Sequence, residues 1–167
     1  MISEVLRSAI DQQINRELYS SYLYMAAASH LASENFPGMA SWMQTQADEE
    51  MVHARKFIKF VEDRDATVSF DAIDKPHADF TTPLSAFESA LEHERLITRH
   101  INDLYTLALE QSDYACQGLL QWFINEQVEE EAMVTEVVEK LRRAGDNGAA
   151  LLMLDRQLSA RDADGSE

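Results

Sequence analysis

Helix-breaking residues are scarce in this chain and fall at only a few places. Its 167 residues include three prolines and five glycines, and between these breaks hydrophobic residues recur about every 3.5 residues over long stretches. Such spacing is typical of amphipathic helices that bury one face. We therefore predict a single all-α domain, residues 1–158, built as a four-helix bundle. The long helices are expected over residues 4–33, 37–64, 84–112 and 114–143.

Two connections determine the predicted topology. Pro37 and Gly38 form a tight turn, so the first two helices should be antiparallel. Residues 65–83, by contrast, lose the periodicity and contain Pro76 and Pro83. When extended, this segment could reach roughly 60 Å, whereas the second helix is only about 42 Å long. We expect it to cross the whole bundle, so that the third helix runs parallel to the second.

A short fifth helix is predicted over residues 149–158, and it is unusually apolar. Its large apolar side chains are Leu151, Leu152, Met153, Leu154 and Leu158. Because the core of four helices is complete without them, we expect this helix to pack against other subunits. Residues 159–167 are expected to form a polar tail.

Each of the four long helices carries a carboxylate in the middle of its hydrophobic stripe. The carboxylates are Glu17, Glu50, Glu94 and Glu130. Two of them have a polar neighbour three positions away on the same stripe, His53 for Glu50 and Gln127 for Glu130. An unpaired buried carboxylate costs several kcal/mol, and the stripes place no lysine or arginine at that depth. We therefore predict that two divalent metal ions neutralise the four carboxylates. Oxygen ligands with one imidazole suit iron(II) or manganese(II), and they also accept zinc(II).

Three segments resemble the bacterial and archaeal non-haem ferritins. They are ELYSSYLY at 17–24, EEMVH at 49–53 and LQWFINEQVEEE at 120–131. The resemblance implies a ferritin-like four-helix bundle with a long crossover and a short fifth helix. It also implies an iron-storage protein that assembles as a homo-oligomer, a hollow cage of 24 subunits.

The same resemblance implies a ferroxidase centre. Glu17, Glu50 and His53 would bind one iron, and Glu94 and Glu130 the other, with Glu50 as the bridge and Gln127 beside it. Two iron(II) ions would be oxidised by O2 or H2O2 to a bridged diferric species, which then passes into a mineral core. Tyr24 either donates an electron or only packs. Glu49, Glu126 and Glu129 resemble a third iron site of this family. The alternative is that these residues form a solvated acidic face.

Three alternatives remain at this stage. The first is a haem-binding bacterioferritin, but bacterioferritins carry a second Glu-x-x-His where this chain has Gln127 and Glu130, so haem is not expected. Met51 stands where their haem ligand would be and is predicted only to pack. A rubrerythrin-type di-iron oxidase would normally bring a four-cysteine segment, and Cys116 is the only cysteine. A metal-free helical interaction protein, with protonated or hydrated core carboxylates, is the third alternative.

The overall charge restricts the partners. Thirty acidic and fourteen basic residues give a net charge of −16, which disfavours nucleic acid and anionic membranes and favours cations. We expect neither a signal peptide nor a membrane span, and the single cysteine fits the cytoplasm. The histidines without partners at ligand spacing are predicted to lie on the surface: His30, His77, His93 and His100.

Overall fold

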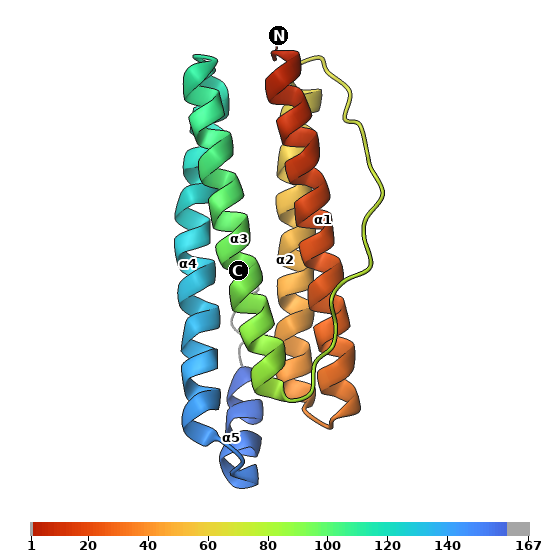
Figure 1. Ribbon diagram of the computed structural model, residues 1–167, viewed down its shortest axis with the longest axis vertical. Helices are drawn as coiled ribbons and strands as arrows, with labels where there is room; N and C mark the ends of the chain where they lie inside the picture. The colour runs from red at the N-terminus through yellow and green to blue at the C-terminus, as the bar shows by residue number, and fades with distance from the viewer. Residues whose placement is uncertain (1, 160–167) are drawn as a thin grey trace.

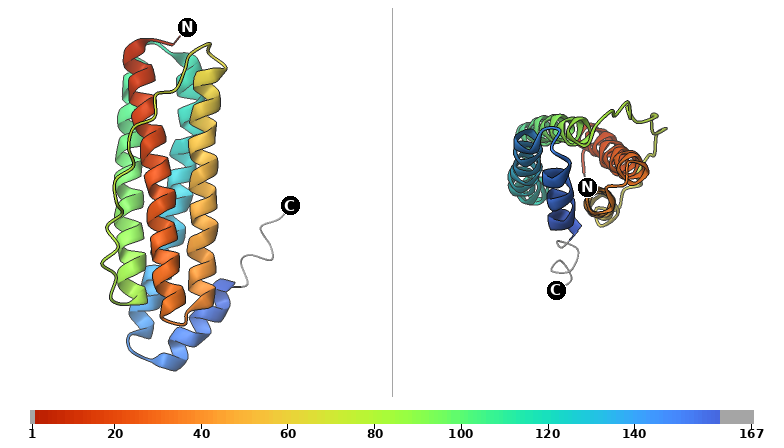
Figure 2. Two further views of the ribbon diagram at one scale, coloured as in Figure 1. Left: turned by 90° about the vertical axis from the view of Figure 1, so that its right-hand side faces the viewer. Right: turned by 90° about the horizontal axis from the view of Figure 1, so that it is seen from below.

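The computed structural model describes residues 2–159, which form five helices and no strand. The helices are α1 (Glu4–Ser33), α2 (Pro37–Glu62), α3 (Pro83–Glu110), α4 (Tyr114–Ala144) and α5 (Gly148–Ser159). The first four lie side by side along one axis, with α1 paired to α2 and α3 to α4 (Figures 1 and 2). This confirms the predicted bundle with a short fifth helix. None of the described helices is long and apolar enough to span a membrane.

The crossover between α2 and α3 runs the length of the bundle beside α1 (Figures 1 and 2), so α2 and α3 are parallel, as predicted. Side chains of α1 hold this irregular segment in place. The Asn15 side-chain amide donates to the carbonyl oxygens of Asp71 (3.3 Å) and Ala72 (3.1 Å), and the Tyr19 hydroxyl accepts from the His77 backbone N–H (3.4 Å). These bonds satisfy backbone groups that a structureless segment would otherwise leave to water.

Some predicted helix ends are wrong by one or two residues. α2 ends at 62 rather than 64, and α3 at 110 rather than 112, while α3 begins at 83, α4 ends at 144 and α5 spans 148–159. After α1, α2 and α3, the residues with positive φ are Asn35 (63°), Asp65 (57°) and Ser112 (52°). In each case the next residue's N–H bonds to the carbonyl five positions back. Glycine usually marks this turn, so its absence left no signal in the sequence.

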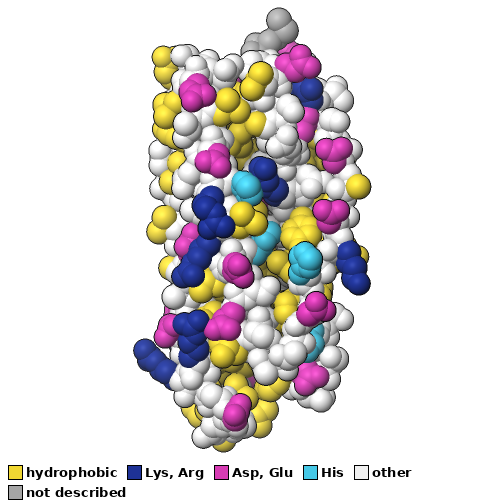
Figure 3. Space-filling view, viewed as in Figure 1, with side chains coloured by type: hydrophobic (Ala, Val, Ile, Leu, Met, Phe, Trp, Pro, Cys, Tyr) yellow, Lys and Arg dark blue, Asp and Glu magenta, His cyan; other side chains and the backbone are white. Residues whose placement is uncertain are grey.

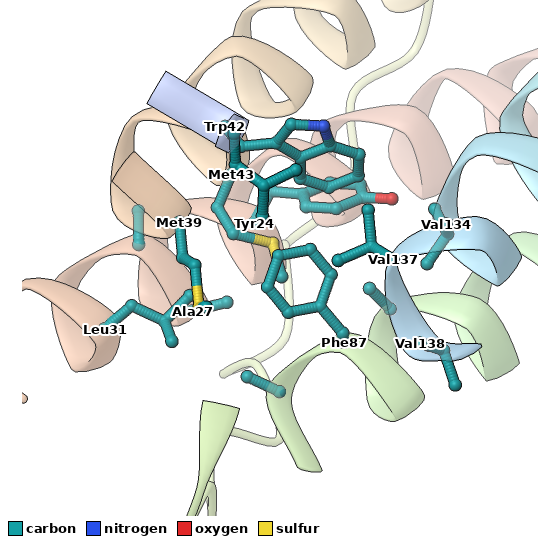
Figure 4. Close-up of a cluster of buried hydrophobic side chains, with 14 of the residues drawn as sticks. Tyr24, Ala27, Leu31, Met39, Trp42, Met43, Phe87, Val134, Val137 and Val138 are labelled. Carbon is teal, nitrogen blue, oxygen red and sulfur yellow. The ribbon is translucent and has the colours of Figure 1, made fainter. Parts of the chain in front are cut away.

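Two hydrophobic clusters fill the bundle on either side of a polar middle layer. One cluster includes Tyr24, Trp42 and Phe87 and is shown in Figure 4. The other includes Phe57 and Phe123, whose rings stack at 4.1 Å between centroids. On every long helix, the residues of one cluster lie on one side of the core carboxylate along the helix, and the residues of the other cluster lie on the other side. The packed clusters therefore hold the polar layer in place from both ends.

Helix α5 packs on α2 and α4 of its own chain, at one end of the bundle (Figure 1). Leu154 and Leu158 are buried there, whereas Leu152 and Met153 are 57 % and 76 % exposed. The expectation that α5 packs against other subunits is therefore wrong for its inner face, which packs on its own chain. The predicted tail lies outside the described residues, apart from Ser159, which belongs to α5.

Candidate metal centre

The polar middle layer brings together six side chains from the four long helices, and each is at most 3 % exposed. They are Glu17, Glu50, His53, Glu94, Gln127 and Glu130. α1 and α3 each supply one residue, whereas α2 and α4 each supply two residues spaced three apart, which is neighbouring spacing on a helix. The centre is thus assembled from all four helices and closed from water.

Glu17, Glu50 and His53 form the first group of potential metal ligands. One donor atom from each lies within 4.8 Å of the other two. The Nδ1 atom of His53 is 3.4 Å from Oε2 of Glu50. Among the described residues, Oε2 of Glu17 and Oε2 of Glu50 are buried without a hydrogen-bond partner. Buried carboxylate oxygens of this kind are what a cation would satisfy.

His53 also belongs to a second group, with Glu126 and Glu130. Its Nε2 atom lies 3.9 Å from Oε1 of Glu126. The imidazole thus presents one ring nitrogen to Glu50 and the other to Glu126. Of the other predicted acidic residues, Glu49 is half-buried and Glu129 is exposed. Neither belongs to a group of three potential ligands whose donor atoms lie within 4.8 Å of one another.

Three buried glutamines orient three of the four core carboxylates. Their side-chain amides donate from Gln13 to Glu17 (2.7 Å), from Gln46 to Glu130 (2.8 Å) and from Gln127 to Glu94 (3.1 Å). Glu50 is the core glutamate that receives no bond from a glutamine side chain. Gln13 and Gln46 were not predicted as site residues, although each lies four positions before a core carboxylate on its own helix.

Tyr24 contacts the centre directly. Its hydroxyl donates a hydrogen bond of 2.5 Å to Oε1 of Glu94, and its side chain is buried. Burial raises the pKa of Tyr24 well above its ordinary value, and the negative charges of Glu94 and Glu50 add to this effect. The phenol therefore stays protonated and remains a donor to Glu94.

The metal-free centre retains protons on its carboxylates. Burial raises the pKa of Glu17 to about 7 and that of Glu130 to about 8. The pKa values of Glu50 and Glu94 are also raised, chiefly by burial. Burial lowers the pKa of His53 to about 4, so its imidazole is neutral at pH 7. A neutral imidazole beside carboxyl groups that titrate near or above neutral pH is suited to accept a divalent cation in exchange for protons.

Aromatic rings form one wall of the centre. The imidazole of His53 meets Trp122 and Phe123 edge-on, at 5.6 and 5.7 Å between ring centroids. Lys56 lies over the Trp122 ring, with its Nζ 4.2 Å from the centroid. These rings hold His53 in place. Trp122 was not predicted as a site residue, because its position relative to His53 depends on how α4 packs against α2.

Three of the four histidines predicted to lie on the surface are half-buried: His30, His93 and His100. Nε2 of His93 lies 2.7 Å from the Ser20 hydroxyl, and its ring contacts Tyr19. The ring of His30 packs against Phe80. The prediction failed because these partners come from another helix or from the crossover and leave no spacing signal within one helix. His77 is exposed, as predicted.

Known proteins match the chain along nearly its whole length. The family model for the ferritin-like domain matches residues 7–144. A bacterial non-heme ferritin of Bacteroides fragilis (strain 638R) is 40 % identical over 161 residues, covering 96 % of this chain and all of the relative. A second, from Staphylococcus aureus (strain USA300), is 36 % identical over 164 residues, covering 98 % and 99 %.

A solved structure has the same fold. The open pore ferritin of the hyperthermophilic archaeon Archaeoglobus fulgidus superposes with a TM-score of 0.93 at 43 % identity, covering 95 % of this chain and 98 % of the other. These matches confirm the resemblance that the three sequence segments indicated. The chain belongs to the ferritin family.

Proposed function

We propose that this chain oxidises iron(II) at the buried centre and stores the iron(III) as a mineral inside an oligomeric cage. The observation that carries the proposal is the gathering of four buried glutamates in one layer, three of which offer an oxygen within 4.8 Å of a ring nitrogen of His53 while Glu94 acts electrostatically on Glu50. Carboxylate oxygens of Glu17 and Glu50 are left without hydrogen-bond partners among the described residues. The similarity to proteins named bacterial non-heme ferritin supports iron as the metal. In this proposal iron is the substrate.

The carboxylates would have distinct tasks. Glu17 and His53 bind one iron, Glu94 and Glu130 bind the other, and Glu50 bridges the two. This division is supported by the glutamine contacts, because Gln13, Gln127 and Gln46 each fix one terminal carboxylate and leave Glu50 to adjust between two ions. Gln127 also lies beside the second iron. Such fixed donors reduce the reorganisation needed when the metal binds.

The redox step balances with the two irons alone. Two iron(II) ions give two electrons, which with two protons reduce O2 to H2O2, or reduce H2O2 to two waters. Carboxyl protons displaced by the metal are one source of these protons. This step needs no electron from Tyr24, whose hydrogen bond to Glu94 would instead hold that carboxyl group in position. The protein contributes charge and position, and the metal contributes the redox chemistry.

The acidic residues beside the centre suggest a route for iron(III) to leave. Glu126 is half-buried and faces Nε2 of His53, while Glu129 is exposed on the same helix and Glu49 is half-buried on α2. Together they would form a third iron site, graded from the closed centre to the surface. Assembly into a 24-subunit cage is likewise proposed from the family resemblance, and the exposed Leu152 and Met153 on α5 would be available for contacts between subunits.

An iron titration tests the proposed function. Anaerobic addition of iron(II), followed by exposure to oxygen, is expected to saturate at two or three irons per chain before mineral growth begins. Light scattering on the same sample should show a particle of many subunits. Failure to bind iron in a monomeric protein would refute both the centre and the cage, and would favour a metal-free interaction protein.

Metal binding is expected to release protons and to become tighter as the pH rises from 6 to 8. At pH 7, the pKa of about 8 keeps Glu130 mostly protonated, and that of about 7 leaves Glu17 about half protonated, so a cation must displace protons from both. Zinc(II) calorimetry in two buffers with different ionisation heats should detect roughly one or more protons released per chain. No proton release, with a pH-independent affinity, would place the metal elsewhere.

A further inference from the structure

A groove of about 510 Å³ lies between α1, α3 and the crossover, apart from the metal centre. Its polar lining includes Arg16 from α1, His93, Arg99 and His100 from α3, and His77 from the crossover. Histidines and basic side chains gather in the middle of the face in Figure 3. The volume is in the range of sites for small molecules. We call this cavity the basic groove.

The groove contains more histidines and arginines than acidic residues, although the chain is strongly acidic. Three of the five histidines and two of the fourteen basic residues line it. Burial lowers the pKa of His100, and the positive charges of Arg16 and Arg99 lower it further, against an opposing effect of Asp103. Burial also lowers the pKa of His93 to about 4, so the positive charges of the groove near pH 7 are those of Arg16 and Arg99. Two carboxylates, Asp74 and Glu92, also line the groove, and they are exposed to water, as is Arg99.

Neither arginine forms an ion pair within the described chain, although the charges of Glu17 and Asp103 act on Arg16. Arg16 is half-buried, and its guanidinium donates to the side-chain oxygen of Gln13 at 3.2 Å. Among residues 2–159, neither Arg16 nor Arg99 has a carboxylate oxygen within 4.0 Å. Arg16 is thus partly buried without a direct ion pair, whereas Arg99 is exposed in the same groove; an anion from solution would pair with both.

The walls of the groove are fixed and partly apolar. The Ser20 hydroxyl donates to the backbone oxygen of Arg16 (3.0 Å), so the contact of 2.7 Å between Ser20 and His93 is a bond donated by Nε2 of His93. This bond ties α3 to α1 across the groove. Leu23, Leu96 and the Tyr19 ring provide apolar surface. A wall that is already fixed lowers the conformational entropy that the protein would lose when a ligand binds.

We propose that the basic groove binds a small organic anion that carries a phosphate or carboxylate group and an apolar part. The guanidinium groups of Arg16 and Arg99 suit two oxygens of such a group, because arginine binds oxyanions through paired N–H donors. The apolar part would lie against Tyr19 and Leu96. This site shares no proposed iron ligand with the metal centre, although Arg16 is linked to Glu17 through Gln13.

Calorimetry on the chelator-treated, metal-free full chain tests the site, with phenyl phosphate and inorganic phosphate as probes. Phenyl phosphate is expected to bind once per chain with a Kd in the submillimolar range, and about threefold or more tighter than inorganic phosphate because its ring contacts the apolar wall. Arg99→Gln is expected to weaken phenyl phosphate binding about tenfold, through loss of a charge-assisted hydrogen bond.

Arg142→Gln is the matched control. Arg142 is an exposed arginine that pairs with Glu88 and Glu139 and does not line the groove, yet its replacement changes the net charge equally. It should leave the Kd within about twofold. His100→Asn provides a second groove variant, and circular dichroism checks that each variant folds. No binding of phenyl phosphate at 10 mM, about a hundredfold above the expected Kd, or equal weakening by Arg99→Gln and Arg142→Gln, would overturn the proposal.

Discussion

Replacing Glu50 by alanine is expected to abolish the rapid oxidation of the first two iron(II) ions per chain while leaving the fold and assembly intact. Glu50 lies in the first ligand group with Glu17 and His53, and electrostatic effects from Glu94 and Glu130 also reach it. Because its loss removes an oxygen donor from both proposed iron positions, the rate should fall by about two orders of magnitude or more.

Stopped-flow measurement of iron(III) formation checks this rate, and anaerobic zinc(II) calorimetry checks binding without the redox step. Glu110→Ala is a suitable control, because Glu110 is an exposed glutamate at the end of α3, far along that helix from Glu94. The control should oxidise iron at the wild-type rate. Oxidation by Glu50→Ala at the rate of the control would contradict the assignment of the centre.

The stability of Glu50→Gln distinguishes a metal centre from a structural polar cluster. The pKa of Glu50 is raised in the folded chain, so its carboxyl stabilises the fold below the unfolded pKa of 4.5, and this contribution is lost as the pH rises through the folded pKa. Glutamine has nearly the same volume and cannot ionise. The metal-free variant should therefore be more stable than the wild type at pH 8 and similar to it at pH 4. A structural role predicts a loss of stability at both pH values.

The sequence predicted the bundle and its core carboxylates for a physical reason. Helical periodicity marks which positions are buried, and a carboxylate at such a position, as at Glu17 or Glu94, is costly enough to require a partner. The contacts of Gln46 could not be predicted in the same way. Its amide donates to Glu130 on α4, and that contact depends on how α2 packs against α4.

Features made by the crossover were also beyond the sequence. The length of this segment predicted that it would span the bundle, but not that Tyr19 and Asn15 would anchor it along α1. The basic groove depends on that path, because His77 comes from the crossover and Arg16 and Arg99 from two helices. Periodicity describes each helix alone, so it places charges on a face without showing which other charges meet them.

Among the described glycines, Gly38 is the one whose replacement by alanine is expected to destabilise the fold most. A Cβ atom at Gly38 would lie 1.9 Å from the backbone oxygen of Asp155, so α5 would have to move as a unit. The move would also break the bond of 2.8 Å from the Met39 N–H to Oδ1 of Asp155. This bond matters because Phe36, at the N-cap of α2, provides no side-chain cap. Overpacking and loss of the cap together should cost about 3 kcal/mol.

Gly118→Ala is the matched control for urea unfolding of the two variants. A Cβ at Gly118, inside α4, would meet no atom within 4 Å, and alanine there should stabilise the helix by up to about 1 kcal/mol. Opposite signs are therefore expected for the same chemical change. Equal effects would show that α5 is not held against α2 as the contact at Gly38 requires. Since detachment of α5 would expose Leu154 and Leu158, Gly38→Ala should also alter the particle size measured by light scattering if α5 contributes to assembly.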